Sequence, residues 1–264
     1  MIDGAAASGH PPAKPAGTRP GAMRRTLWAV GVLVGLVVIF FIADFGIRLS
    51  AQSQIRDQIL KELPAGVTAD DLSVSIGGLS VIGQYLTGSF EQVELHSERV
   101  AVDGATVAVS VLARGIPTDF TRPVQRITGR VAMSQDDVNA LVKIPDATSK
   151  ITLGEGTLGY SGSTAFLGIP IAYQATVVPK ANGETVLLKP ESARITAGPA
   201  GLDLGSFVRE VVGGDGFAFC AAEHLPEGVT VQTITVRPGS AEVTIAASNL
   251  VLNEKTLASR GTCS

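Results

Sequence analysis

The pattern of hydrophobic positions begins with one uninterrupted apolar run over residues 27–43, LWAVGVLVGLVVIFFIA. The run has 17 residues without a charge, or 18 with Thr26, which is enough for a helix to span the hydrocarbon core of a bilayer. Arg24 and Arg25 precede the run and Asp44 follows it. Because positive charge stays on the cytoplasmic side, the pattern predicts a cytoplasmic N-terminus and an extracytoplasmic chain after residue 43.

A cleaved signal peptide is the alternative interpretation of this run. The run exceeds the usual length of a signal-peptide apolar region, and only the weak candidate site Leu49-Ser50-Ala51 follows it, so we favour an uncleaved signal anchor. The predicted organisation is a Pro-rich, disordered cytoplasmic tail over residues 1–25, a single-pass transmembrane anchor over 26–43 and one domain over 44–264. Both interpretations place that domain outside the cytoplasm.

Directly after the run, the apolar spacing becomes helical. Apolar residues recur at steps of four from Ala51 to Leu63, with polar residues between them. This spacing places the apolar side chains on one face and predicts a helix over residues 47–63. Pro64 ends the helical pattern.

Alternating apolar and polar positions dominate the rest of the chain and predict strands. Asp103-Gly104 and Asn182-Gly183 have the composition of tight hairpin turns between such strands. Ser134, with Asp137 three residues later, predicts a capped short helix, and a further apolar face predicts a helix over 202–212.

One short segment occurs twice in similar surroundings. LPAGVT at residues 63–68 recurs as LPEGVT at 225–230, each time between a helical pattern and an alternating strand. The repetition fits either an internal duplication of a helix–strand unit or a helix-ending turn that arose twice. The sequence leaves both interpretations open.

The charge of the chain argues against nucleic-acid binding, and the number of cysteines argues against a structural zinc site. The net charge of −3 divides into +3 for residues 1–43 and −6 for the remainder, and an acidic domain without a basic stripe is a poor nucleic-acid binder. Cys220 and Cys263 are the only cysteines, too few for a structural zinc site. In an oxidising compartment they can form one disulfide, and otherwise they are two small unpaired residues.

The search for catalytic chemistry finds no convincing site. His96 and His224 have the surroundings of surface or capping residues, and residues 159–163, GYSGS, lack the second glycine and the helix that a nucleophile elbow requires. Asp70-Asp71 and Asp136-Asp137 are better explained by the ends of elements than by acid–base chemistry. We therefore predict no catalytic residue, no metal site, no cofactor and no enzymatic activity.

The strands carry Val, Ile or Leu on one face, and many glycines beside them allow a sheet to bend. Two interpretations are open: a packed core under one curved sheet, or an apolar cavity that binds a ligand. Residues that share parity within a strand face the same side. The candidate lining residues of a cavity are Val74, Ile76, Val93, Leu95, Val107, Val109, Ile171 and Tyr173.

Three segments, following the N-terminal apolar run, resemble the LmeA-like phospholipid-binding family of actinobacterial envelope proteins. They are DLSVSIGGLSVIGQYLTGSFEQVELHSERVAVDGATVAVSVLARGIPTD at 71–119, ITGRVAMSQDDVNALV at 127–142 and FCAAEHLPEGVTVQTITV at 219–236. The resemblance covers about residues 44–254. It implies an α+β fold like that of the tubular lipid-binding superfamily: a curled antiparallel sheet wrapped on a long helix, with an apolar groove.

The resemblance also implies a function. Members of the LmeA-like family are associated with phospholipid binding and, in mycobacteria, with mannan and lipoglycan elongation. The family offers no catalytic motif. The leading hypothesis is a membrane-anchored phospholipid-binding protein of the cell envelope, with phospholipid and the cell membrane as partners. The alternatives are an envelope scaffold without a cavity and a hydrolase with an unrecognised site. The sequence specifies neither the lipid nor a protein partner.

Overall fold

The computed structural model describes residues 20–63, 66–119, 121–142, 150–166, 169–197, 200–203 and 216–263. It divides into two compact units, residues 1–43 and 44–264, and the boundary falls within the helix α1 (Pro20–Glu62). Residues 20–25, which the sequence assigned to a disordered tail, belong to α1, because Pro20 has the fixed φ that suits a first helical turn. The rest of that tail, residues 1–19, lies outside the described residues.

The N-terminal unit contains the apolar part of α1. Its large side chains from Val30 to Ile42 are exposed, and the helix is long and apolar enough to cross a membrane. A membrane anchor and a signal sequence both fit this helix. The predicted helix over 47–63 is confirmed as the C-terminal part of α1, which belongs to the second unit.

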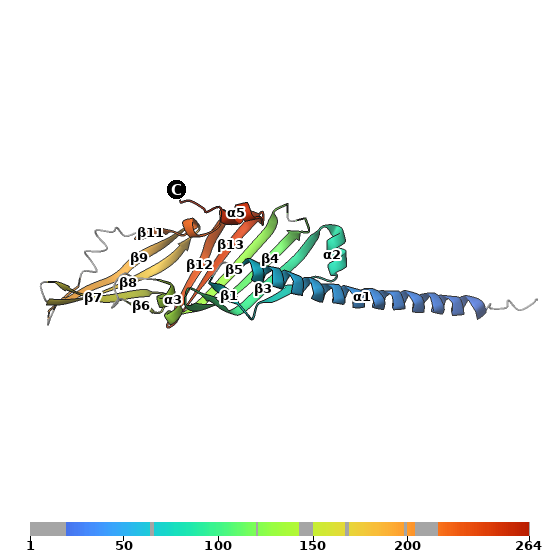
Figure 1. The fold of residues 1–264 in the computed structure, drawn as a ribbon, viewed down its shortest axis with the longest axis horizontal. Helices are drawn as coiled ribbons and strands as arrows, with labels where there is room; N and C mark the ends of the chain where they lie inside the picture. The colour runs from blue at the N-terminus through green and yellow to red at the C-terminus, as the bar shows by residue number, and fades with distance from the viewer. Residues whose placement is uncertain are drawn as a thin grey trace, which may run out of the picture. The chain divides into compact units, whose positions relative to one another are not determined.

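The second unit contains a seven-stranded antiparallel sheet, here called the first sheet (Figure 1). Its strand order is β1–β3–β4–β5–β13–β12, and β2 also pairs with β3. The strands are β1 (Val67–Ala69), β2 (Ser73–Ile76), β3 (Ser89–Val102), β4 (Ala105–Pro117), β5 (Val124–Ser134), β12 (Val229–Arg237) and β13 (Ser240–Leu250). Both copies of the repeated segment lead into edge strands of this sheet, β1 and β12.

A six-stranded antiparallel sheet, the second sheet, has the order β10–β9–β8–β7–β6, and β11 also pairs with β9. Its strands are β6 (Lys150–Leu153), β7 (Leu158–Phe166), β8 (Ile169–Asn182), β9 (Thr185–Ala197), β10 (Ala200–Asp203) and β11 (Phe217–Cys220). Leu202 and Asp203 thus lie in a strand where a helix was predicted, and most of that predicted helix lies outside the described residues.

Short helices lie between the strands and after the last one. They are α2 (Val81–Thr87), α3 (Gln135–Leu141), the 3-10 turn η1 (Ala222–His224) and α5 (Glu254–Ala258). The predicted cap of α3 is confirmed: the Ser134 hydroxyl accepts from the Asp137 N–H, and the Asp137 carboxylate accepts from the Ser134 N–H. An α+β fold with antiparallel sheets is therefore what this sequence forms.

The predicted hairpins are also present. Val102 pairs with Ala105 around Asp103-Gly104, and both turn residues have positive φ, 48° and 89°, as a type I′ turn requires. Asn182 pairs with Thr185, so the second turn consists of Gly183-Glu184. The Asn182-Gly183 signal thus located the hairpin with the turn displaced by one residue.

The strands form two hydrogen-bonded sheets where one curled sheet was expected. Backbone contacts join the two sheets at two places. A bridge pairs Gly183 with Val231, next to a bulge in the pairing of β12 with β13, and further along the Gly156 N–H donates to the Val236 carbonyl and the Gly239 N–H to the Leu153 carbonyl. The short helix α3 also joins them, because Asp137 accepts from Thr106 in β4 while Asn139 exchanges two hydrogen bonds with Ile151 in β6. Asn139 thereby satisfies backbone groups at an edge of the second sheet.

Candidate functional site

The first sheet and the helices beside it line a partly open apolar cavity of about 420 Å³. This volume lies in the range of small-molecule sites, roughly 300–1,000 Å³. Among the residues that the structure describes, those that line it are all apolar: Ile55, Ile59, Ile76, Phe90, Val93, Leu95, Val111, Ala113, Ile116, Ile127, Pro226, Val229, Ile245, Leu250, Leu252 and Leu257.

Strand register explains why residues so distant in sequence line one cavity. In one row across the sheet, Ile76 pairs with Val93, Val93 with Ala113, and Ala113 with Ile127. The same row continues through Ala247 to Val229. Directly paired residues project to the same face, so one row supplies apolar side chains from six strands.

The neighbouring row has a glycine at its centre. Leu95 pairs with Val111, Val111 with Gly129, and Gly129 with Ile245. A Cβ atom at Gly129 would lie 3.0 Å from Cγ1 of Ile245, so glycine lets the Ile245 side chain lie over β5. Substitution there would force Ile245 to move.

At one end of the cavity, the β4 residues that face it change from odd-numbered to even-numbered positions. Val111 and Ala113 line the cavity from β4, and so does Ile116, an odd number of positions further on. Between them, Gly115 has φ of 62°, a left-handed conformation that glycine adopts without strain. Phe90, which pairs with Ile116, then reaches the same cavity from β3.

Helical residues complete the lining. Ile55 and Ile59 are four residues apart, so they lie on one face of α1, and Leu257 of α5 contributes from the C-terminal end of the chain. The part of the lining that the structure describes can bind an apolar chain and offers no group for proton transfer or nucleophilic attack. The cavity is therefore suited to binding hydrocarbon.

The carboxylates with perturbed acidity stabilise local structure. The Ser97 hydroxyl donates to Asp71, and together with the N–H groups of Glu98 and Arg99 it holds the pKa of that carboxyl below its usual value. Asp71 thereby secures the irregular stretch of β3 between Ser97 and Val100. A hydroxyl donor, here Ser134, likewise lowers the pKa of Asp137, as does the N–H of Thr106.

The structure brings three of the predicted lining residues, Ile76, Val93 and Leu95, into the cavity. Val74 pairs with Leu95 in the same row but is absent from the lining. Val107 and Val109 share the parity of Val111 further along β4 and lie outside the lining, with Val107 buried.

Ile171 and Tyr173 belong to β8 of the second sheet, away from this cavity. Tyr173 lies against Tyr160, with 5.7 Å between ring centroids, beside a hollow of about 390 Å³. That hollow has polar as well as apolar lining, including Ser161, Gln174 and Arg194.

Sequence reasoning missed most of the other lining residues. The face of the predicted helix that carries Ile55 and Ile59 was visible, and so was the parity of Val111, but neither was assigned to a site. Ile127, Val229 and Ile245 enter only through the order of the strands, which no local pattern records.

The remaining candidates for chemistry lie apart from one another. His96 lies in β3, 3.9 Å from Glu98, and both side chains are well exposed. His224 stacks on Phe219, with 5.5 Å between ring centroids. The GYSGS segment lies within β7 and does not form a strand-to-helix elbow. Among the described residues, no group of three or more His, Cys, Asp or Glu side chains is arranged to hold a metal ion.

Cys220 and Cys263 are joined by a disulfide in this structure. The bond links β11 of the second sheet to the segment that follows α5. Backbone N–H groups of Ala221 and Ala222 donate to the carbonyl of Glu184 beside it, at 3.0 and 2.9 Å. The disulfide therefore ties the C-terminal segment to the β8–β9 hairpin.

An antiparallel α+β fold with an open pocket whose described lining is apolar fits a protein that binds apolar ligands. The family model described as LmeA-like phospholipid-binding matches residues 42–246, which is most of the chain. The chain belongs to this family, which is a binding family and not a known enzyme family. A search of curated proteins and a search of solved structures each found no match.

Proposed function

We propose that this protein is a membrane-anchored phospholipid-binding protein whose main domain lies outside the cytoplasm and serves biogenesis of the cell envelope. The observation that carries the proposal is the apolar cavity of the first sheet, in a chain that belongs to a phospholipid-binding family. The cavity takes acyl chain, and the polar headgroup stays outside the apolar lining. The protein acts by binding and does not catalyse a reaction.

The energetics favour this use of the cavity. Transfer of each CH₂ group from water to an apolar site stabilises the complex by about 0.8 kcal/mol, so a few buried carbons offset the cost of ordering a chain. A polar ligand would lose its hydrogen bonds to water without replacement by this lining. Hydrocarbon is thus the chemistry that the site selects.

The test is lipid retention by the full-length protein, purified in a mild detergent and examined by native mass spectrometry. We expect the wild type to carry phospholipid from its host membrane. Val111→Asp places a charge on the cavity face and should abolish retention. Ser110→Asp, on the opposite face of the same strand, should retain lipid and serves as the matched control.

A folded wild-type protein that carries no lipid, and takes up none from vesicles, would contradict the proposal. The scaffold hypothesis would then take its place.

Orientation is tested separately with alkaline phosphatase fused after Ser264. Phosphatase activity outside the cytoplasm is expected, because Arg24 and Arg25 precede the apolar run.

A further inference from the structure

The loop before α2 and α2 itself expose large apolar side chains. Leu79, Tyr85 and Leu86 have exposed fractions of 85%, 66% and 79%, although the helix has only seven residues. We call these three side chains the α2 foot. Single exposed leucines are common on soluble proteins, but a concentration of this kind on one small element indicates an interaction surface.

The foot is held in a defined conformation by its own polar groups. Ser80 caps the N-terminus of α2 by accepting from the Gly83 N–H, and Gly88 ends the helix with φ of 82°. The buried Gln84 side chain donates to the carbonyl of Gly77 at 2.9 Å and accepts from the Glu91 N–H at 2.7 Å. The exposure of the apolar side chains is therefore a fixed feature of the fold.

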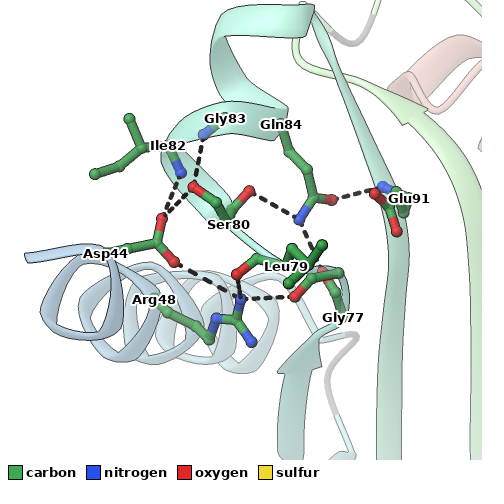
Figure 2. Close-up of polar contacts among 10 residues, drawn as sticks. Asp44, Arg48, Gly77, Leu79, Ser80, Ile82, Gly83, Gln84 and Glu91 are labelled. Atoms are coloured by element: carbon green, nitrogen blue, oxygen red, sulfur yellow. Dashed lines mark hydrogen bonds and ion pairs between the residues drawn. The ribbon is translucent and has the colours of Figure 1, made fainter. Parts of the chain in front are cut away.

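A polar clamp attaches the foot to α1 (Figure 2). The buried Asp44 carboxylate accepts hydrogen bonds from the Ser80 hydroxyl at 2.8 Å and from the Ile82 N–H at 2.9 Å. Arg48, one helical turn later, donates to the carbonyl of Gly78 at 2.8 Å and lies 3.7 Å from Asp44. These contacts fix α2 to the first turn of α1 that follows the apolar run.

The position of the clamp in the chain identifies the partner. Asp44 directly follows the run that ends at residue 43, and Phe45 and Leu49 beside it are also exposed. We propose that the α2 foot docks into the interfacial region of the bilayer in which α1 is anchored. Leucine side chains partition into the headgroup–acyl boundary, and tyrosine is enriched there because it has an apolar ring and a polar tip.

Docking of the foot also determines which end of the cavity faces the membrane. The foot lies in the connection between β2 and β3, and the two residues that flank it, Ile76 and Phe90, both line the cavity. A foot inserted at the interface holds this end of the cavity beside the lipid surface. This inference rests on the anchoring and lipid binding proposed above, and it identifies the route of lipid entry.

Depth measurements on the full chain test the docking. Leu79→Cys and Leu86→Cys, each labelled with an environment-sensitive fluorophore, are reconstituted into phosphatidylglycerol–phosphatidylcholine vesicles. Ser240→Cys, at an exposed turn of β12–β13, is the control. We expect lipid-borne shallow quenchers to quench the labels at 79 and 86 and to spare the label at 240. Equal access of aqueous iodide to all three labels would overturn the inference, as would shielding that appears only as protein density rises.

Lipid uptake separates this inference from the proposed function. The double variant Leu79→Ser/Leu86→Ser should fold normally and retain lipid acquired during expression, but should take up lipid from vesicles roughly tenfold more slowly. Val142→Ser removes an apolar side chain that is 46% exposed at the C-terminal end of α3 and should leave uptake unchanged. Normal uptake by the double variant would overturn the foot as the route of lipid entry. A wild type without lipid would contradict the proposed binding function, and the depth measurements would then decide the docking by themselves.

Discussion

The two sheets of the domain share the same alternating pattern, yet they use it differently. On the first sheet, one face and the residues Ile55 and Ile59 of α1 line a partly open apolar cavity. On the second sheet, the hollow across β7, β8 and β9 includes Ser161 and Arg194 in its lining. Alternation selects a face for apolar side chains, but an enclosed apolar volume also requires another element to cover that face.

A charge introduced on each sheet tests this difference most directly. Leu95→Asp places an unpaired carboxylate in the cavity of the first sheet, so we expect loss of bound lipid and destabilisation by about 3–5 kcal/mol. Tyr173→Asp, on the second sheet, should leave lipid retention intact. Native mass spectrometry and chemical denaturation measure the two effects. Release of lipid by Tyr173→Asp would extend the binding surface onto the second sheet, as the sequence pattern predicted.

Removal of the disulfide tests how far the two sheets depend on each other. Cys220 and Cys263 are 43 positions apart, and a loop of this size predicts stabilisation by about 4 kcal/mol in the chain-entropy account. Cys220→Ser/Cys263→Ser should lower the free energy of unfolding by up to this amount and weaken lipid retention, because the C-terminal segment also carries Leu257. Unfolding with and without reductant provides the comparison. Free thiols at both positions in unreduced protein harvested from outside the cytoplasm would rule out the bond.

Filling the cavity with an uncharged side chain tests whether lipid retention depends on the volume of the cavity, separately from the polarity of its lining. Ala113→Phe places a ring among the lining residues and should reduce the amount of lipid retained, with a stability cost of about 1–3 kcal/mol where the ring overpacks. Ala246→Phe is the matched control, since Ala246 lies beside a separate hollow that contains Arg126 and Gln232. Equal lipid retention by the two variants would show that the bound chain lies elsewhere.

The smallest expected effect is a change in the pH dependence of stability, and it concerns α3, the helix that joins the two sheets. The pKa of Asp137 is held below its usual value, so its contribution to stability is fully present above about pH 4 and is lost as the pH falls through the folded-state pKa. Ser134→Ala removes the largest cause of that shift and a helix cap, at a cost of about 1 kcal/mol near neutral pH. Denaturation at several pH values should show a shallower loss of stability on acidification in Ser134→Ala. If stability depends on pH in the same way in Ser134→Ala and in the wild type, Asp137 does not make this contribution.

Much of the local structure could be predicted because local chemistry decides it. Asp103-Gly104 permits positive φ at both positions, and Ser134 with Asp137 can satisfy the free N–H groups of a helix start, so neither signal needed a distant partner. The apolar run and the helix after it are likewise readable from spacing alone. The boundary at residue 25 was less accurate, because α1 already begins at Pro20.

The candidate site was only partly predictable because parity within a strand gives a face but not its neighbours. Ile76, Val93 and Leu95 lie in the cavity, whereas Val109 has the same parity as Val111 and lies outside its lining. Position along the strand relative to the covering helices separates these two residues. No local sequence pattern records where along a strand the helices lie.

The sequence by itself determined the apolar N-terminal helix, the antiparallel hairpins and the apolar character of one strand face, since each depends on neighbours a few residues away. Only the tertiary structure decided that β13 pairs with β5, and thereby brought Ile245 opposite Gly129 and into the cavity beside Val111. It also decided that Asp44 clamps α2 across 36 positions of sequence. Such contacts arise from the combined packing of the whole chain, because the free energy of a long-range pair depends on every element that brings its members together.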